Sequence, residues 1–384
     1  MSIVKFGDIV REVKLNVDRD NNPYEFYVAG EHMDTEDLTI RCKGLFATDD
    51  VGPAFTRIFK KGQILYGSRR TYLKKVAVAD FDGICSNTTF VLESKNEHVF
   101  CQKLLPFIML TDSFTKWSIS HSKGSTNPYI LFSDLANYAF ELPSLDEQRV
   151  LADKLWAAYE VKESYKNLLA QTDKLLHAQF QKMFGVETPQ LKIKDVLQES
   201  FSGEWGKEDL DNSGVKVLRT TNFMNNGSLD YTNIITRNID EDKLKKKKLL
   251  RGDIILERSG GTADNPVGRV VYFDVDGLYL CNNFTQVLRC KDSINSKYLF
   301  YNLYYYYQDH KSEVRSMGSQ TTGIQNLSLT KYYEVEIPVP PMEKQLEFVQ
   351  IAEQAEQTKA SLHKGIEAIE AVIRSLIAEG TTKV

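Results

Sequence analysis

Two long stretches of the chain place apolar side chains at alternating intervals of three and four residues. One follows Pro143 and the other follows Pro340, about half the chain later. Such narrow spacing is typical of a coiled-coil seam, whereas a helix that packs on a domain surface usually shows a broader apolar face. At 1.5 Å per residue, about 38 residues would make each helix about 57 Å long. The predicted seam consists of Leu151, Leu155, Tyr165, Leu169 and Leu176 in the first stretch, and Phe348, Leu362, Ile366, Ile369 and Ile373 in the second.

Both stretches begin with the same motif. Pro-Ser-Leu-Asp-Glu-Gln at residues 143–148 opens the first, and Pro-Pro-Met-Glu-Lys-Gln at residues 340–345 opens the second. A lysine interrupts each apolar stripe at the equivalent step, Lys162 and Lys359. A single repeat at this separation indicates two domain-sized units, because solenoid repeats recur every 20–50 residues or so. The alternative is a pair of ordinary amphipathic helices, each packed on its own domain.

The segments that precede the two helices share an order of landmarks. Short apolar runs broken by Gly, Asp and Pro predict strands and turns. We expect residues 76–79 to form a hairpin with the following strand through a turn at Asp82 and Gly83. The corresponding segments of the two units are residues 62–66 and 252–256, the turns at 82–83 and 276–277, and the predicted helices at 101–111 and 298–307.

The order of unit, helix, unit and helix predicts a geometry. For the second helix to pack along the first, it has to run back toward the first unit, so the pair is expected to be antiparallel, with both chain termini near unit one. We therefore predict a dumbbell with approximate two-fold symmetry. Palindromic or split DNA sites are natural targets for such a molecule.

Composition narrows the class of protein. The 384 residues are 42% hydrophobic and 26% charged, as in ordinary globular proteins that bury sizeable cores. The sequence has no apolar run of the length that spans a membrane and no signal-peptide pattern at its N-terminus. Five cysteines without a Cys-x-x-Cys pair fit a reducing compartment, so a cytoplasmic location is expected. The net charge of −4 suggests that any DNA-binding surface is local, or that a partner supplies part of the positive charge.

With these features, the chain resembles the specificity (S) subunit of type I restriction–modification systems over essentially its whole length. The most specific elements are the doubled helix-start motifs, the Gly-(Gln/Asp)-Ile-(Leu/Ile) strand starts at Gly62 and Gly252, and Gly-Ile-Gln-Asn-Leu at residues 323–327. The first unit departs from the pattern at residues 126–129, Thr-Asn-Pro-Tyr, where the second has Thr-Thr-Gly. The expected fold class is α+β, with two pseudo-symmetric α/β target-recognition domains separated by two long antiparallel helices that form a coiled coil.

The resemblance implies a division of labour along the chain. In this family, each target-recognition domain reads one half of a split DNA site, while the helices set the gap and dock two modification (methyltransferase) subunits. Those partners bind S-adenosylmethionine and methylate adenine, and motor (restriction) subunits join them to cut DNA. We therefore expect a non-catalytic chain without a cofactor of its own, which binds double-stranded DNA and no membrane. The expected bounds are 1–142 for recognition domain 1, 143–184 for helical spacer 1, 185–338 for recognition domain 2, and 339–384 for helical spacer 2.

Basic residues gather in the loop after each strand start. Arginine pairs with guanine edges or phosphates, and tyrosine packs on a sugar or a base. The corresponding loop of the second unit is glycine-rich, which permits close approach of its backbone to DNA. The alternative is a solvated hairpin with charged ends. The candidate DNA contacts in these loops are Arg69, Arg70, Tyr72, Lys74 and Lys75 in the first unit, and Arg258, Ser259, Thr262 and Arg269 in the second.

Two polar loops precede the long helices, at residues 123–127 and 318–322. Their N–H and hydroxyl groups suit contacts with phosphate, but turns that merely position the next helix would look the same. A lysine-rich run at residues 243–248 is typical of a solvated charged face, with phosphate contact as the alternative. The candidate contacts in the two loops are Lys123, Ser125, Ser319, Gln320 and Thr321.

Signatures of enzymes are weak. Asn127-Pro128-Tyr129 resembles the Asn-Pro-Pro-Tyr motif of adenine methyltransferases but lacks one proline, and no glycine-rich methyl-donor motif precedes it. Asp253 and Glu257 resemble nuclease carboxylates, although a turn at the strand start explains Asp253 better. No phosphate-binding loop occurs, and the histidines lack metal-ligand spacing, so we expect no catalytic residue and no metal site. The alternatives are a stand-alone DNA adenine methyltransferase or nuclease, and a structural rod that joins two protein-binding domains.

Overall fold

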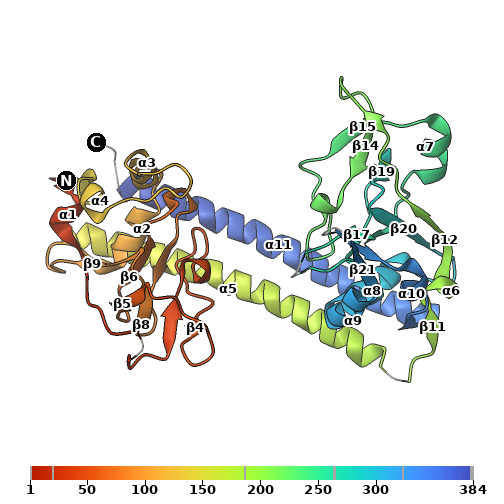
Figure 1. Cartoon of the computed structure of the whole chain (residues 1–384), viewed down its shortest axis with the longest axis horizontal. Helices are drawn as coiled ribbons and strands as arrows, with labels where there is room; N and C mark the ends of the chain where they lie inside the picture. Colours follow the sequence, from red (N-terminus) through yellow and green to blue (C-terminus); the bar gives the residue numbers. More distant parts are fainter. Residues whose placement is uncertain (1, 20, 186, 263–264, 322–323, 381–384) are drawn as a thin grey trace. The chain divides into compact units, whose positions relative to one another are not determined.

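The computed structural model describes residues 2–19, 21–185, 187–262, 265–321 and 324–380. The chain divides into two compact units (Figure 1). Unit 1 combines residues 1–168 with residues 362–384, and unit 2 comprises residues 169–361. Each unit therefore contains one globular domain and a part of each long helix.

Within the described residues, unit 1 contains two four-stranded sheets and one separate strand pair. The first sheet has the antiparallel order β2 (Val10–Glu12), β9 (Thr89–Ser94), β6 (Ile64–Gly67), β7 (Val76–Val78). The second has the order β4 (Gly44–Leu45), β3 (Phe26–Val28), β8 (Gly83–Ser86), β5 (Phe55–Phe59), with β3 and β8 parallel. The strand pair is β1 (Ser2–Lys5) with β10 (Ala139–Leu142). The short helices are α1 (Phe6–Ile9), α2 (Leu105–Met109), α3 (Asp112–Ser120) and α4 (Phe132–Leu135), and 3₁₀ turns lie at Gly30–His32, Thr71–Leu73 and Gln102–Leu104.

Unit 2 repeats this plan and adds a small sheet, as far as its described residues go. The first four-stranded sheet has the order β12 (Leu197–Ser202), β20 (Thr285–Cys290), β16 (Ile254–Glu257), β18 (Val270–Tyr272). The second has the order β13 (Lys207–Glu208), β15 (Ile235–Asn238), β14 (Val215–Leu218), β19 (Tyr279–Cys281). β11 (Gln190–Lys192) pairs with β23 (Glu336–Pro338), and the added sheet is β17 (Ser259–Gly260), β22 (Ile324–Leu327), β21 (Gly318–Thr321). The helices are α6 (Ile193–Val196), α7 (Glu241–Lys247), α8 (Ser296–Asp309), α9 (Lys311–Ser316) and α10 (Leu329–Tyr333), with a 3₁₀ turn at Thr220–Asn222.

The strand starts that repeat in the sequence occupy equivalent places in the two units. β6 and β16 are each an inner strand of a four-stranded antiparallel sheet. Ile64 faces one hydrophobic core and Leu65 faces another, and Ile254 and Ile255 divide in the same way. Because both faces of the strand are buried, its sequence is a continuous apolar run and not an alternating one. The duplicated α/β fold predicted from the sequence is confirmed.

The predicted hairpin of residues 76–79 is wrong. β7 pairs with β6, whereas β8 belongs to the other sheet and pairs with β3 and β5. Gly83 is the first residue of β8, and a Cβ atom there would stand 2.7 Å from the ring of Phe59 and 2.9 Å from the carbonyl oxygen of Phe26. The glycine therefore permits close packing of a strand, a role that a local turn pattern does not distinguish from a turn.

Two further local expectations need correction. Residues 318–321 form strand β21 and not a loop, because they pair with β22. The helix expected over residues 101–111 consists of the 3₁₀ turn at Gln102–Leu104 followed by α2, which ends at Met109. The second predicted helix, over residues 298–307, is confirmed as the core of α8.

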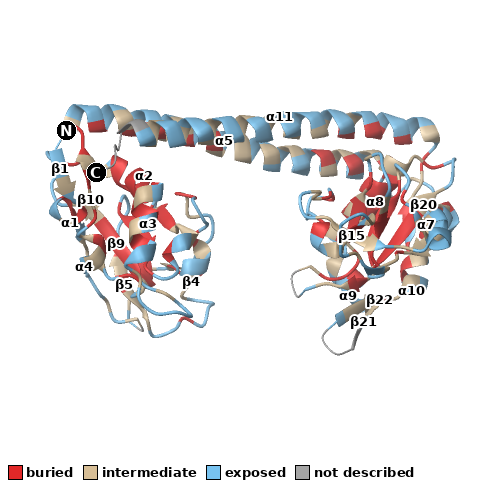
Figure 2. Cartoon of the chain, turned by 90° about the horizontal axis from the view of Figure 1, so that it is seen from above, coloured by how far each residue is buried: buried red, intermediate tan, exposed pale blue. Residues whose placement is uncertain are grey.

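The two long helices are α5 (Leu145–Met183) and α11 (Met342–Gly380), each of 39 residues. In unit 1 the start of α5 lies beside the end of α11, and in unit 2 the end of α5 lies beside the start of α11, so the pair is antiparallel (Figure 1). Buried residues gather inside the domains and on the helix segments that cover them (Figure 2). No helix in the described part of the chain is long and apolar enough to cross a membrane.

The predicted seam residues divide into two groups by burial. Leu155, Leu176 and Phe348 are buried in the cores of the domains, and Leu151 and Ile373 pack against the core of unit 1. The remaining five, which lie nearer the middle of the helices, are half-buried: Tyr165, Leu169, Leu362, Ile366 and Ile369. The stripe thus packs on the domains at its ends, while its assignment as one continuous seam stays a prediction.

The structure explains the glutamine that ends both helix-start motifs. Gln148 and Gln345 are each 1% exposed. The side-chain amide of Gln148 donates to the carbonyl of Pro143 at 3.0 Å and accepts from the N–H of Cys101 at 2.9 Å. Gln345 donates to Pro340 and accepts from Asn295, both at 2.8 Å. Each glutamine thereby ties the start of a long helix to the segment that leads into a domain helix.

A carboxylate, a tyrosine and a lysine attach each domain to a long helix. In unit 1 the carboxylate is Asp37 of the domain, which accepts from Tyr159 of α5 at 2.6 Å and from Lys166 at 3.0 Å. Burial alone would raise the pKa of Asp37, but these hydrogen bonds outweigh it and hold the pKa far below its usual range. In unit 2 the roles are reversed, since Glu356 of α11 accepts from Tyr301 and Lys297 of α8 at 2.7 and 2.6 Å.

Replacing Gln345 with leucine is expected to lower the free energy of unfolding of unit 2 by about 1–3 kcal/mol, because the Asn295 N–H and the Pro340 carbonyl would lose their buried partner. Urea unfolding of the full chain measures the change. Gln354→Leu, at an exposed position of the same helix, is the matched control and should unfold like the unmodified chain. Equal stability of the two variants would contradict the proposed role of the amide.

Candidate nucleic-acid interface

In unit 1, the structure brings together two candidate segments that are far apart in the sequence. Arg69 and Tyr129 form an antiparallel bridge, and Tyr129 pairs in turn with Lys123 through hydrogen bonds of 2.7 and 2.9 Å. The N–H of Arg70 donates to the carbonyl of Pro128 at 2.7 Å. The guanidinium of Arg69 lies 6.0 Å from the centre of the Tyr129 ring. The loop after β6 and the loop before α4 therefore form one surface, called here the unit 1 tip (residues 69–72 and 123–129).

Unit 2 has an equivalent surface made of strands. β17 follows β16 directly, and Ser259 pairs with Asn326 of β22, which pairs with Ser319 of β21. The hydroxyl of Ser259 also donates to the side-chain oxygen of Asn326 at 2.7 Å. Ser259, Asn326 and Ser319 thus correspond to Arg69, Tyr129 and Lys123 of unit 1. We call this surface the unit 2 tip (residues 259–262 and 318–327, as far as they are described).

Several candidates at the unit 1 tip are exposed to solvent. Exposed side chains can exchange water for phosphate or base edges, and rigid backbone pairing keeps them in place. Tyr72 is 52% exposed, and Lys123 forms an ion pair with Asp134 at 3.2 Å while its side chain stays half exposed to solvent. The exposed candidates of this tip are Arg69, Arg70, Tyr72, Lys123 and Ser125.

Two other basic candidates in unit 1 have partners inside the protein. Lys74 forms ion pairs with Glu36 at 2.6 Å and with Asp112 at 3.1 Å. Partial burial would lower the pKa of Lys74, but the two carboxylates outweigh it and raise the pKa. Lys75 donates its ammonium group to the carbonyl of Gly30. These contacts support the loop from within the protein, and contact of either lysine with DNA stays a prediction.

The candidates in unit 2 differ in their exposure to solvent. Ser259 is buried, and Arg258 is half-buried with its guanidinium 3.3 Å from the carbonyl of Asn283. Thr262 and Ser319 are exposed. Gln320 and Thr321 lie at the end of β21, but their side chains lie outside the described part of the chain.

Arg269, which is half-buried, and Glu257, which is buried, form an ion pair beneath the unit 2 tip. Arg269 Nε lies 2.7 Å from Glu257, whose side chain is 2% exposed. Partial burial would lower the pKa of Arg269, but the carboxylate of Glu257 outweighs it and raises the pKa. Glu257 also accepts from the N–H of Gly261 at 3.4 Å. The pair therefore supports the glycine loop from below, so a structural role accounts for Glu257 where the sequence offered a nuclease carboxylate.

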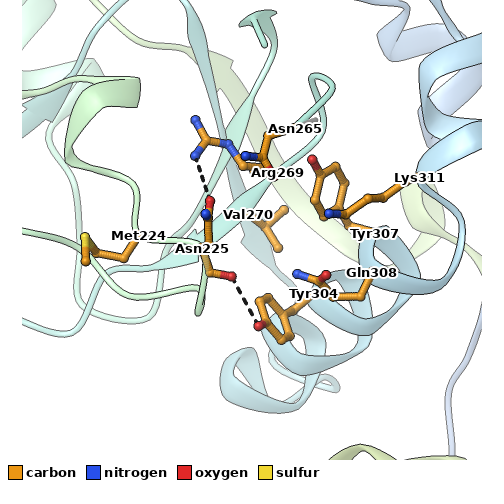
Figure 3. Close-up of a pocket in the computed structure, with 9 residues that line it drawn as sticks. All are labelled: Met224, Asn225, Asn265, Arg269, Val270, Tyr304, Tyr307, Gln308 and Lys311. Atoms are coloured by element: carbon orange, nitrogen blue, oxygen red, sulfur yellow. Dashed lines mark hydrogen bonds between the residues drawn. The ribbon is translucent and has the colours of Figure 1, made fainter. Parts of the chain in front are cut away.

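Arg269 also lines two hollows that the sequence did not reveal, and Figure 3 shows the smaller one. One has a volume of about 190 Å³ and is bounded by Asn225, Asn265, Tyr304 and Lys311, among others. The neighbouring hollow, of about 620 Å³, shares Asn225, Asn265 and Arg269 with it and reaches the glycine loop. Side-chain amides such as these match the donor and acceptor pattern of an adenine edge. The Asn-Asn-Gly sequence at residues 225–227 predicts a turn here. Only the fold shows that residues of α8 and α9 line the smaller hollow together with this turn.

The lysine-rich run lies mostly in α7. Lys243 and Lys247 both reach the carboxylate of Glu204, each at 3.1 Å. Burial would raise the pKa of Glu204, but the two lysines outweigh it and lower the pKa. Part of the positive charge of this run is thus neutralised within the protein.

The comparisons with known proteins agree with this duplicated arrangement. The sequence matches the family model described as the type I restriction modification DNA specificity domain over residues 7–171 and again over residues 186–371. The chain is 29% identical over 189 residues to the specificity subunit of the type I restriction enzyme EcoDI from Escherichia coli, an alignment that covers 48% of this chain and only 40% of that subunit. It is 22% identical over 319 residues to the StySPI specificity subunit from Salmonella potsdam, which covers 73% of this chain and 67% of that subunit.

Two solved structures share the fold. One is a chain from a study of complex assembly and conformational transition of the type I R-M system, with 19% identity, a TM-score of 0.56, and coverage of 99% and 97% of the two chains. The other is the S subunit of a type I restriction–modification system from M. genitalium, with 14% identity, a TM-score of 0.54, and coverage of 100% and 96%. At these identities, the likeness concerns the fold.

If the unit 1 tip binds phosphates, replacing both Arg69 and Arg70 with alanine should weaken duplex binding and flatten its dependence on salt. Each lost phosphate contact is expected to reduce the slope of log K against log salt by about 0.9. Titrations of the full chain with its partner subunits at several salt concentrations measure this slope. Arg251→Ala, which removes an arginine whose side chain is 66% exposed, is the control. Unchanged slopes in the double variant would remove this tip from the interface.

Proposed function

Because the chain belongs to the type I restriction modification DNA specificity family, we propose that it is the non-catalytic subunit that selects the DNA sequence in a type I restriction–modification complex. Each recognition domain would read one half of a split site. The observation that carries this proposal is the duplication: two units of one fold present equivalent tips, built from different residues. One scaffold with two different surfaces suits a target whose halves differ in sequence.

The proposed division of the chain follows the same logic. Residues 1–142 and 185–338 would be the recognition domains, and residues 143–184 and 339–384 the helical spacers that set the gap. Side chains at the tips would contact both bases and phosphates, and lysines and hydroxyl groups around them would hold further phosphates. The cytoplasm, where the chain would meet DNA, is the proposed location.

The outer faces of the long helices are proposed to dock two modification subunits. Val161, Leu168 and Leu175 follow one another on α5 at intervals of seven residues and are 39%, 46% and 71% exposed. A regular apolar stripe that faces solvent is typical of a helix that packs against a partner helix. Methyl transfer would then take place on the partners, which would carry S-adenosylmethionine, and motor subunits would join that complex.

The carboxylates considered for a nuclease have structural partners. Asp253 is 2% exposed in its side chain and binds Arg289 at 2.8 Å, and it accepts from the N–H of Leu250 at 2.7 Å. Both oxygens of Asp253 and both of Glu257 accept hydrogen bonds within the fold. Asp253 precedes β16 and Glu257 ends it, so both carboxylates suit a structural role at this strand. Measuring S-adenosylmethionine binding to the purified chain separates the proposal from a stand-alone methyltransferase, which would bind it without partners.

Exchange of residues 185–338 for the corresponding domain of a related chain is expected to change one half of the methylated site and to leave the other half intact. Co-expression with a modification subunit, followed by sequencing of methylated adenines, measures the outcome. The unmodified chain provides the reference site. Methylation without a two-part consensus in that reference would overturn the proposed function.

Replacing Leu175 with aspartate should weaken association with the modification subunit by about tenfold or more, because docking would remove a carboxylate from water without a partner. Co-purification at several concentrations measures the loss. Ala170→Asp introduces the same charge at another exposed position of α5 and should have little effect. Equal loss in both variants would indicate damage to the helix, and no loss in either would exclude this stripe.

A further inference from the structure

The two lysines that interrupt the apolar stripes each form an ion pair with the opposite helix. In unit 1, Lys162 of α5 lies 2.9 Å from Glu370 of α11. In unit 2, Lys359 of α11 lies 2.7 Å from Asp173 of α5. The contacts are reciprocal, because each helix supplies the lysine of one pair and the carboxylate of the other.

The spacing of these residues is the same on both helices. Asp173 follows Lys162 by eleven residues, and Glu370 follows Lys359 by eleven residues. Eleven residues make about three turns at 3.6 residues per turn, so the lysine and the carboxylate lie on one face of each helix. In an antiparallel pair, this equal spacing lets both lysines meet carboxylates in a single register.

A slip of one heptad in either direction loses both pairs. If α11 slid by one heptad in one direction, Lys162 and Lys359 would face Ile377 and Phe180. A heptad in the other direction would place them opposite His363 and Lys166. Lys162 has a side chain only 10% exposed, so a register that leaves it without a carboxylate would bury an unpaired charge, which is costly.

A close contact in unit 1 supports the same register. A Cβ atom on Gly365 would stand 2.5 Å from the ring of Tyr165 on the facing helix. Because Gly365 has no side chain, the ring of Tyr165 can occupy this space. A shift of one heptad would put Thr358 or Val372 opposite this ring, and either residue would occupy that space.

We propose that Lys162–Glu370 and Lys359–Asp173 are positioning pairs that fix the axial register of α5 and α11, and with it the gap between the two half-sites. The inference rests on the proposed function, in which the helices set that gap. Exposed ion pairs contribute little to stability, and the side chains of Glu370 and Asp173 are 36% and 57% exposed. A polar residue within an apolar seam instead selects one register among several. A slip of one heptad moves a helix by about 10 Å, or about three base pairs at 3.4 Å each.

The test compares three full-length chains, each co-expressed with a modification subunit. One carries Glu370→Gln and Asp173→Asn, which remove both pairs. The second carries Lys162→Glu, Glu370→Lys, Lys359→Asp and Asp173→Lys, which restore both pairs with reversed charge. The control carries Asp146→Asn and Glu347→Gln. Each of these carboxylates forms its ion pair with a residue of its own helix and not with the opposite helix.

Sequencing of methylated adenines reports the gap. The chain without the pairs is expected to raise the fraction of methylated sites with a non-standard gap at least tenfold, while the reversed pairs and the control keep the gap of the unmodified chain. An unchanged single gap in the chain without the pairs overturns the proposal. If that chain does not fold, the reversed chain decides, since a changed gap despite restored pairs also overturns it.

A distance measurement separates this inference from the proposed function. Spin labels are attached at Ala157→Cys and Ala371→Cys, two exposed positions of unit 1. The chain also carries Cys42→Ser, because Cys42 is exposed. Pulsed electron paramagnetic resonance then measures the distance between the labels, which reports the register. Loss of the pairs should add a population displaced along the helices by about 10 Å. A single narrow distance distribution in the chain without the pairs overturns the proposed role of the positioning pairs, whatever the methylation result. Absence of a two-part consensus in the unmodified chain contradicts the proposed function alone.

Discussion

Residues from the far end of the chain pack against the hydrophobic core of unit 1. Ile373, Leu376 and Ile377 of α11 pack against a core whose other residues come from positions before 160. Closing so long a segment costs conformational entropy, so α11 has to gain enough apolar contact in unit 1 to remain beside α5. Each unit therefore depends on both long helices.

The helix starts show how this packing is made specific. Apolar contact alone would tolerate small shifts of a helix along a domain, because hydrophobic attraction has no direction. Gln148 and Gln345 add direction, since each buried amide is satisfied only when the proline carbonyl and the domain N–H are both in place. The ion pairs of Lys162 and Lys359 act in the same way along the helices. Polar groups inside an apolar frame thus select one arrangement among several that would bury similar area.

The basic residues fall into two groups, those that form ion pairs within the protein and those that are exposed at the unit 1 tip. Lys74, Lys247 and Arg269 have carboxylate partners within their own domains, whereas Arg69 and Arg70 are exposed at the unit 1 tip. The net charge of −4 is therefore compatible with a local positive surface. The two tips also differ in kind, because unit 1 presents arginines and a tyrosine while unit 2 presents hydroxyl and amide groups beside a hollow. Different chemistry on one scaffold fits the reading of two different half-sites.

The sequence by itself determined the duplication, the two long helices and the buried inner strands, because the periodicity of apolar residues and a repeated motif report them directly. It also singled out the basic and polar candidates, although residues 318–321 form a strand and not the loop that was expected. Only the tertiary structure decided that Arg69 forms a bridge with Tyr129 and that β7 and β8 belong to different sheets. It also decided that Arg269 pairs with Glu257 beside Asn225. These relations join residues of separate segments, and their partners are chosen by the packing of sheets and helices, which no local pattern specifies.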